Sequence, residues 1–193
     1  NTTKSLVLFV VLVLSLFLFI SGCTEQNAEV TTDGSSSDQQ QAFQYPLTIT
    51  DFANRSVTFK ESPKRIVTVN PADMEIIYAL GGKVVGRPQK SFGDVRPPEA
   101  EKAEAVGRPQ VINFEKVSAL KPDMFVGHKR LNVKDVPTLE AFGLNVVLTQ
   151  GDSVDEVIDL IGMYGNILNK QEQANALVNT IEQEIEKTVK GNQ

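Results

Sequence analysis

A chain of 193 residues with 41% hydrophobic residues and a net charge of −5 is long enough for one domain of ordinary size. Its mildly acidic balance argues against nucleic-acid binding, which needs a concentrated basic face. With one Cys and one His in the whole chain, we expect neither an intrachain disulfide nor a zinc site of the usual Cys/His type.

The chain begins with an apolar run at residues 6–20 that follows Lys4. A run of about fifteen residues is short for a membrane-spanning helix and is typical of a secretory signal. The run ends in Ile20-Ser21-Gly22-Cys23, which resembles the lipobox of exported lipoproteins, in which an aliphatic residue and two small residues precede a Cys. We therefore predict a lipoprotein signal peptide over residues 1–22 and lipidation of Cys23, which would anchor the protein on the extracytoplasmic side of the cell membrane. An uncleaved anchor helix with an incidental Cys is the alternative.

Residues 23–45 are predicted to form a flexible linker. The stretch from Thr24 to Gln44 is polar and low in complexity, with TTDGSSSDQQQ at its centre. Such a sequence cannot bury enough apolar surface to fold. It would act as a tether between the lipid anchor and a folded domain.

Residues 46–150 carry the pattern of an α/β domain. The alternation of apolar and polar residues over 47–59, on both sides of a turn, predicts a β-hairpin. The β-branched run at 66–69 is typical of a buried parallel strand. It leads into a helix that Asn70 is expected to cap, and another strand is expected at 83–86. A strand, a helix and a strand at this spacing predict a right-handed βαβ unit.

The second half of this domain continues the alternation of helices and strands. Asn113 is expected to cap a short helix that ends before Pro122. A strand at 123–126, a helix at 136–142 and a strand at 145–148 are expected after it. These elements predict an α/β fold, a Rossmann-like lobe with a parallel sheet flanked by helices.

Two helices are predicted over residues 151–193. Ser153 followed by Glu156 is a capping-box pattern that opens the first helix. The inward face of this helix is expected to hold Val154, Val157, Ile158 and Ile161. Gly165-Asn166 is expected to break or bend it, and a long second helix is predicted from Lys170 to Lys190.

The stretch PPEAEKAEAVGRPQVINFEKVSALKPD, from Pro97 to Asp123, resembles the periplasmic substrate-binding proteins of ABC importers for iron-siderophores, haem and cobalamin. Members of this family show a segment of prolines and acids, a V-G loop, an N-hydrophobic-E-K helix start and an A-L-K-P-D strand entry, in this order. The resemblance extends from Leu47 to about Lys190, and it implies two lobes with a ligand between them. This chain would hold the N-terminal lobe and the start of the long helix between the lobes, so the second lobe and half of the cleft are expected to be missing.

Candidate ligand-binding residues lie where strands are expected to end, because open α/β sheets bind ligands at the carboxyl ends of their strands. Asn70 starts a helix at such an end, where backbone N–H groups could receive an anion, although a plain helix cap is the favoured alternative. The full set of candidates is Asn70, Arg87, Lys90, Arg108, Gln110, His128, Lys129 and Arg130. Arg suits the anionic groups of ferric siderophores and haem through forked hydrogen bonds. Ordinary solvated loop charges are the alternative.

Two features of these loops bear on the identity of the ligand. His128 lies in the expected loop Gly127–Arg130 and could ligate a haem iron, but a loop His without a partner is favoured. The pentapeptide VGRPQ occurs at 85–89 and at 106–110, which we interpret as two loops under similar demands or as chance. Gln110 in the second copy is a poor haem ligand, and this argues against haem.

The resemblance also implies a docking role for Glu104. An exposed Glu on each lobe of these family members docks into Arg pockets of the membrane permease. The match from Pro97 to Val117 places Glu104 at that position. The alternative is one acid of a solvated face that also holds Glu99 and Glu101.

The sequence predicts a binding protein and not an enzyme. It has no G-x-S-x-G motif, no Walker A sequence and no Cys beyond Cys23. We expect no cofactor and no metal site, but a lipid-anchored extracytoplasmic protein that captures a ferric siderophore and delivers it to an ABC permease and its ATPase. Haem or cobalamin is the alternative ligand. A membrane-anchored interaction or sensor lipoprotein, or a membrane-anchored enzyme, is the alternative function.

Overall fold

The computed structural model describes residues 45–90 and 96–191, all within the unit Gln41–Gln193 into which the contacts divide the chain. The predicted signal peptide, the predicted lipidation site Cys23 and almost all of the predicted linker lie outside the described residues. Among the helices that are described, none combines the length and the apolar character that crossing a membrane requires.

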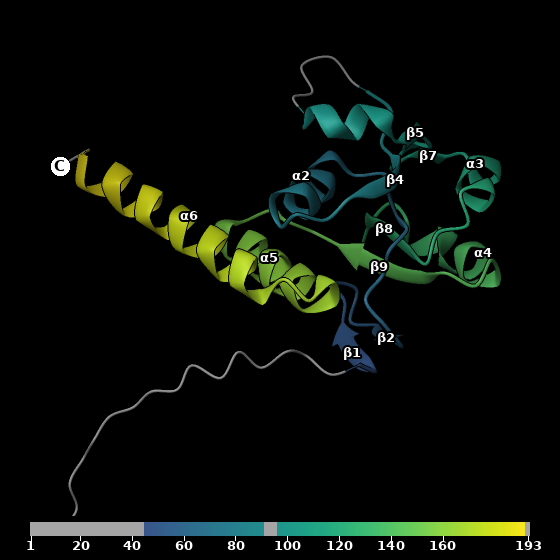
Figure 1. Cartoon of the computed structure of the whole chain (residues 1–193), viewed down its shortest axis with the longest axis horizontal. Coiled ribbons are helices and arrows are strands. Elements are labelled where there is room, and N and C mark those ends of the chain that lie inside the picture. The colour runs from purple at the N-terminus through teal and green to yellow at the C-terminus, as the bar shows by residue number, and fades with distance from the viewer. Residues whose placement is uncertain (1–44, 91–95, 192–193) are drawn as a thin grey trace, which may run out of the picture. The chain divides into compact units, whose positions relative to one another are not determined.

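The first described element is the predicted β-hairpin, formed by β1 (Leu47–Thr50) and β2 (Ser56–Phe59) (Figure 1). The carboxylate of the buried residue Asp51 accepts a hydrogen bond from the N–H of Arg55 at 2.9 Å within the turn. It also accepts one from the N–H of Leu148 at 3.2 Å. Asp51 thereby ties the hairpin to the last strand of the main sheet.

The main sheet has five parallel strands in the order β5-β4-β3-β8-β9. In chain order they are β3 (Ile66–Thr68), β4 (Val84–Arg87), β5 (Glu104–Ala105), β8 (Met124–His128) and β9 (Asn145–Thr149). The chain adds β4 and β5 on one side of β3, then returns to add β8 and β9 on the other side. The strand order therefore reverses between β3 and β8, as in a doubly wound Rossmann-like fold. The predicted α/β fold is confirmed.

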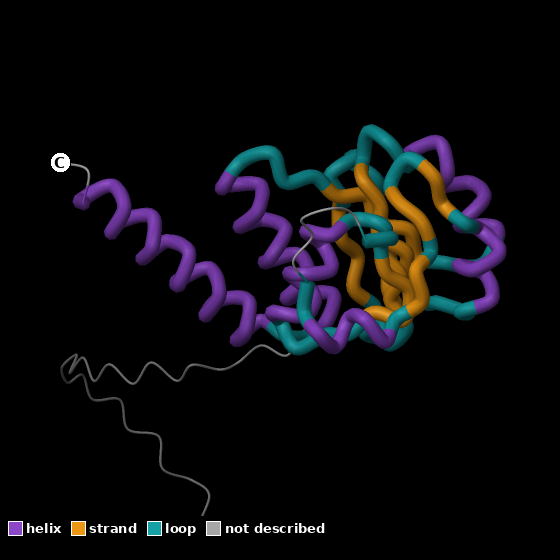
Figure 2. Tube along the Cα trace, turned by 90° about the horizontal axis from the view of Figure 1, so that it is seen from above, coloured by secondary structure: helices purple, strands orange, loops and turns teal. Residues whose placement is uncertain are grey.

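Helices cover both faces of this sheet, as Figure 2 shows. One face carries α2 (Pro71–Ala79) and α5 (Val154–Leu168), with α6 (Gln171–Gly191) packed on α5, and the other carries α3 (Phe114–Ala119) and α4 (Val136–Ala141). Successive strand residues point to opposite faces, so Met124 joins the core beneath α2 and α5 while Phe125 joins the core beneath α3 and α4. Burial on both faces explains why the strands read as continuous apolar runs in the sequence.

Short elements lie in the connections between the strands. They are η2 (Pro98–Lys102), β6 (Gly107–Arg108), β7 (Val111–Ile112) and η3 (Val133–Asp135). The strands β6 and β7 pair with each other as a small antiparallel hairpin. This hairpin follows β5 directly, so it stands at the carboxyl edge of the main sheet.

The helix caps predicted from the sequence are present. Asn70 caps α2, Asn113 caps α3 and Ser153 caps α5, each by accepting a backbone hydrogen bond on its side-chain oxygen. In a capping box, the Glu156 carboxylate would accept a hydrogen bond from the N–H of the cap residue Ser153. Here it accepts instead from the N–H of Asp152, one residue before the cap, at 2.7 Å.

Two predictions about α5 are wrong. Val154 is 51% exposed and does not face inward. Of the other residues predicted for this face, Val157 packs partly against the core and Ile161 is buried. The helix also continues through Gly165 and ends at Asn169, which has a φ of 54°. Gly165 lies against α6, where an added Cβ would come within 2.6 Å of the Cβ of Ala174. The glycine thus allows a close approach of two helices and does not interrupt either of them.

The helix α6 confirms the predicted long C-terminal helix. Its residue Ala174 is buried, and Leu177 and Ile181 pack partly against the core. Further along, Ile185 is 40% exposed and Val189 is 57% exposed. The apolar face of α6 is therefore covered over its first half and open over its second.

Candidate functional site

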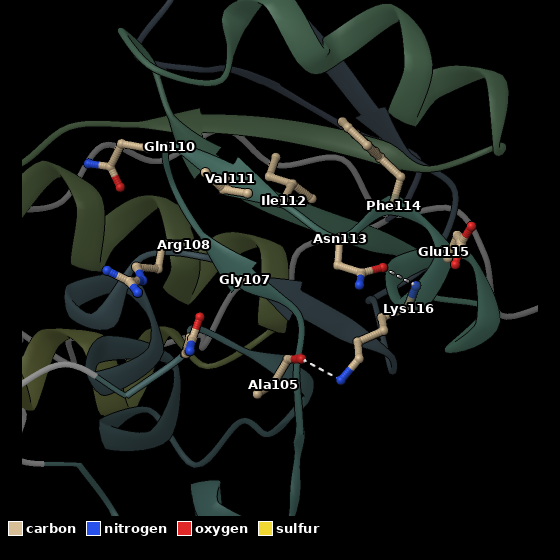
Figure 3. Close-up of a pocket in the computed structure, with 11 residues that line it drawn as sticks. Ala105, Gly107, Arg108, Gln110, Val111, Ile112, Asn113, Phe114, Glu115 and Lys116 are labelled. Atoms are coloured by element: carbon tan, nitrogen blue, oxygen red, sulfur yellow. Dashed lines mark hydrogen bonds between the residues drawn. The ribbon is translucent and has the colours of Figure 1, made fainter.

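A groove of about 970 Å³ lies beside the β6–β7 hairpin. Its walls come from the loop after β4, the end of β5, the hairpin itself and the start of α3 (Figure 3). The loops after β4 and β5 emerge at the carboxyl edge of the sheet, which is where ligands bind in folds of this type. The groove therefore lies at the edge of the sheet where the sequence analysis expects the ligand-binding residues.

The lining of the groove combines apolar surface with hydrogen-bonding groups. Val111 is 74% exposed at the hairpin, and Ile112 and Phe114 add further apolar surface (Figure 3). Two of the predicted binding residues, Arg108 and Gln110, also line it. Such a surface can hold a large ligand by burial while polar groups fix its orientation.

The sequence-based set missed four polar residues of this groove: Gln89, Asn113, Glu115 and Lys116. Gln89 belongs to the first VGRPQ copy, and its N–H donates to the carbonyl of Gly107 in the second copy at 2.6 Å. The N–H of Val106 donates to the carbonyl of Arg87 at 3.0 Å. The two copies of the pentapeptide thus lie side by side, and both contribute to the groove. The repeat itself was the signal that could have identified Gln89.

Arg87 and Lys90 form ion pairs with Glu101, outside the lining of the groove. The Arg87 guanidinium lies 3.1 Å from the Glu101 carboxylate and Lys90 Nζ lies 3.5 Å from it. Arg87 is the last residue of β4 and not a loop residue, and its side chain is only 15% exposed. Neither residue lines the groove.

The loop expected at Gly127–Arg130 begins later than predicted, because β8 extends to His128, which pairs with Thr149 of β9. The Nδ1 atom of His128 accepts a hydrogen bond from the N–H of Arg130 at 3.1 Å. The Arg130 guanidinium forms an ion pair with Asp152. None of the three predicted binding residues here, His128, Lys129 and Arg130, is in the groove lining. Among the described residues there is no cluster of three or more His, Cys, Asp or Glu side chains that could hold a metal ion.

Asn70 acts as a helix cap, the alternative favoured from the sequence, since its Oδ1 accepts from the N–H of Ala72 at 3.2 Å.

The first turn of α2 contains a buried acid that the sequence analysis did not include among the candidate site residues. Asp73 is fully buried and accepts hydrogen bonds from the hydroxyls of Thr149 and Tyr164, both at 2.8 Å. Burial raises the pKa of Asp73 to about 6, although the hydrogen bonds from Thr149 and Tyr164 work in the opposite direction.

Glu104 is the first residue of β5, and its side chain is about half exposed. Its carboxylate forms an ion pair with Lys116, whose Nζ also donates to the carbonyl of Ala105 at 3.3 Å (Figure 3). The hydrogen bond and the positive charge of Lys116 hold the pKa of Glu104 below its usual range. Glu104 is thus an accessible, ionised acid beside the groove.

Residues 66–193 of the chain match a family model described as periplasmic binding protein. An uncharacterized ABC transporter substrate-binding lipoprotein of Bacillus subtilis is 35% identical over 78% of this chain and 48% of its own length. A vitamin B12-binding protein of Salmonella choleraesuis is 34% identical over 50% of this chain and 36% of its own length. The chain therefore spans about half or less of the length of these relatives.

Solved structures share the fold. The Staphylococcus aureus protein SirA, in complex with staphyloferrin B, superposes with a TM-score of 0.60 at 26% identity. The superposition covers 69% of this chain and 46% of that protein. The similarity spans the doubly wound sheet and its flanking helices, and it agrees with the expectation of a binding protein.

Proposed function

The chain belongs to the periplasmic binding protein family, and on that premise we propose that it is the solute-binding component of an ABC importer, working outside the cytoplasmic membrane. The observation that carries the proposal is the groove beside the β6–β7 hairpin, at the carboxyl edge of a doubly wound sheet. In this role the protein captures a solute and presents it to a permease, and a partner ATPase supplies the energy of transport.

The proposed solute is a ferric siderophore. Arg108 brings positive charge to the groove, whereas Lys116 is paired with Glu104 and the acid Glu115 also lines the wall. A guanidinium suits the anionic oxygens of an iron chelate. The similarity to a protein solved with staphyloferrin B supports this ligand class.

Cobalamin is the second candidate, because relatives of this chain are named vitamin B12-binding proteins. Gln89 and Gln110 offer amide donors and acceptors at the groove. Such groups complement the carboxamide side chains of a corrinoid. Haem has less support, because His128 is not among the residues that line the groove.

The proposal includes two further residues from the sequence. Cys23 would carry the lipid that keeps the protein at the membrane. Glu104 would face the permease, since it is exposed and ionised at the edge strand β5.

The test is isothermal titration of the chain with ferric staphyloferrin B and, in parallel, with cyanocobalamin. For the siderophore, Arg108→Gln should weaken binding about tenfold or more, because a charge-assisted hydrogen bond is lost. Lys187→Gln is the matched control, since Lys187 is an exposed cation of α6 outside the groove. Binding of cyanocobalamin alone, with little effect of Arg108→Gln, would assign the corrinoid. Binding of neither probe would contradict the ligand class.

A further inference from the structure

The side chain of Asn132 joins two of the loops at the carboxyl edge of the sheet. Asn132 precedes η3 in the connection after β8, and it is 0% exposed. A fully buried amide is unusual for a loop residue, because each of its polar atoms then needs a partner. In this position every one of them has a partner.

The two ends of the Asn132 amide bond to different elements. Its Oδ1 accepts a hydrogen bond from the N–H of His128, at the end of β8, at 2.9 Å. Its Nδ2 donates to the carbonyl of Pro109 in the β6–β7 hairpin at 2.7 Å, and to the Asp135 carboxylate at 3.0 Å. Its backbone N–H donates to the carbonyl of His128 at 2.8 Å, which fixes the position of the residue independently of its side chain.

Gly127 makes room for this arrangement. A Cβ at Gly127 would come within 2.9 Å of the Cβ of Asn132 and 3.0 Å of its Oδ1. A side chain at that position would push the amide away from its three hydrogen-bond partners. The glycine of β8 and the buried amide therefore function as a pair.

The connection matters because Pro109 lies between the two predicted binding residues that line the groove, Arg108 and Gln110. A hydrogen bond to the Pro109 carbonyl sets where this turn of the hairpin stands relative to the sheet. We propose that Asn132 is a positioning residue, which holds the groove-lining turn of the β6–β7 hairpin against the end of β8 and so sets the affinity for ligand. The part of this inference that concerns affinity rests on the function proposed above, whereas the part that concerns the hairpin does not.

The experiment compares three variants of the whole chain by amide hydrogen exchange and by titration with ferric staphyloferrin B and cyanocobalamin. Asn132→Asp keeps the acceptor for the His128 N–H and removes the donor to Pro109. Asn132→Ala removes both bonds without adding a charge beside Asp135. Asp135→Ala is the matched control, because it removes the other acceptor of the same Nδ2 and leaves the bond to Pro109 in place.

Both Asn132 variants should exchange the amides of residues 107–113 about tenfold faster than the wild type, while the amides of β9 stay protected. Their affinity for whichever probe binds should fall by a similar factor at a temperature where all variants are fully folded. Asp135→Ala should change neither quantity. Gly127→Ala offers a second route to the same result, since its Cβ crowds the Asn132 side chain, and it also comes within 3.0 Å of the Phe125 ring.

The inference would be overturned if the folded Asn132 variants exchanged the amides of residues 107–113 at the wild-type rate. It would also be overturned if Asp135→Ala raised this exchange rate as much as the Asn132 variants do. Failure of the Asn132 variants to fold while Gly127→Ala folds with normal hairpin exchange would overturn it as well. Failure of the wild type to bind either probe would refute the proposed function. In that case the exchange data would still decide the role of Asn132 in the hairpin.

Discussion

At the scale of single residues, Asp73 is a carboxylic acid that is fully removed from solvent. Its carboxyl group is fully buried, with Oδ2 accepting from Thr149 of β9 and Oδ1 accepting from Tyr164 of α5. Burial is the largest influence on its pKa, which rises from 3.8 to about 6, and the hydrogen bonds only partly offset it. The ionised carboxylate is therefore present in the folded protein at neutral pH, but at a cost in stability.

The sign of this effect follows from proton linkage. Between pH 4 and pH 6 the folded state binds a proton at Asp73 that the unfolded state has already released. The stability that Asp73 contributes is thus fully present below about pH 4 and is lost as the pH rises through 6. A shift of about two units corresponds to roughly 3 kcal/mol.

We predict that Asp73→Asn removes this pH dependence. The free energy of unfolding of the variant, relative to the wild type, should increase by up to roughly 3 kcal/mol between pH 4 and pH 7. Urea unfolding followed by circular dichroism at several pH values measures this difference. Tyr164→Phe removes a hydrogen bond that favours the ionised form, so it should shift the midpoint of the wild-type dependence to higher pH. A difference between Asp73→Asn and the wild type that is constant with pH would contradict the prediction.

At the scale of elements, the contact between α5 and α6 depends on one glycine. Gly165 approaches Ala174 so closely that an added Cβ would lie 2.6 Å from the Cβ of that residue. Gly162 is in the same helix, but an added Cβ there would meet nothing within 4 Å. The two positions share a backbone conformation and differ in packing.

We predict opposite effects of the same substitution at these two sites. Gly165→Ala should destabilise the protein by roughly 1–3 kcal/mol, because α6 must move away from α5. Gly162→Ala should stabilise it by about 0.5–1 kcal/mol, because alanine favours the helix over the unfolded chain. Thermal or urea unfolding of both variants gives the comparison, and equal effects at the two sites would show that helix propensity alone decides them.

Most helices and strands could be predicted because the residues that specify them are close together in the sequence. The hairpin from Leu47 to Phe59 and the caps Asn70, Asn113 and Ser153 depend on residues a few positions apart, and all of them are present. The errors arose where distant partners decide the outcome. Gly165 looked like a helix breaker, but its role depends on the return of α6 against α5.

At the scale of the whole molecule, the predicted binding residues and the lining of the candidate groove overlap only in part. Arg108 and Gln110, which were expected at the ends of strands, line the groove. The other candidates lie outside the groove lining, several of them in ion pairs or backbone hydrogen bonds of their own, and no periodicity in the sequence encodes such pairings.

The residues that the sequence did not single out have partners far along the chain. Asp73 is bonded to residues 76 and 91 positions away, and Asn132 to one 23 positions away. Their roles exist only once the sheet has assembled, so local sequence patterns could not reveal them.

In the proposed importer, Glu104 would be the residue of this chain that faces the permease. Glu104 is ionised and accessible on the edge strand β5, but it already has a partner in Lys116 of α3. Docking into a cationic pocket would require the carboxylate to exchange or share this partner. Because Lys116 lowers the pKa of Glu104, the acid remains charged under mildly acidic conditions.

We therefore predict that Glu104→Gln weakens docking to the permease about tenfold, since a charge at the edge of an interface is lost. Affinity for an anionic ligand should not fall, because Glu104 does not line the groove and the loss of its charge frees Lys116, which does. Glu99→Gln is the matched control, an exposed acid in the neighbouring element η2. The measurement is the ligand-stimulated ATPase activity of the importer in vesicles, titrated with each variant at low and at physiological salt. If Glu104→Gln and Glu99→Gln shift the half-maximal concentration equally, only the net charge of this acidic surface matters, and Glu104 has no specific docking role.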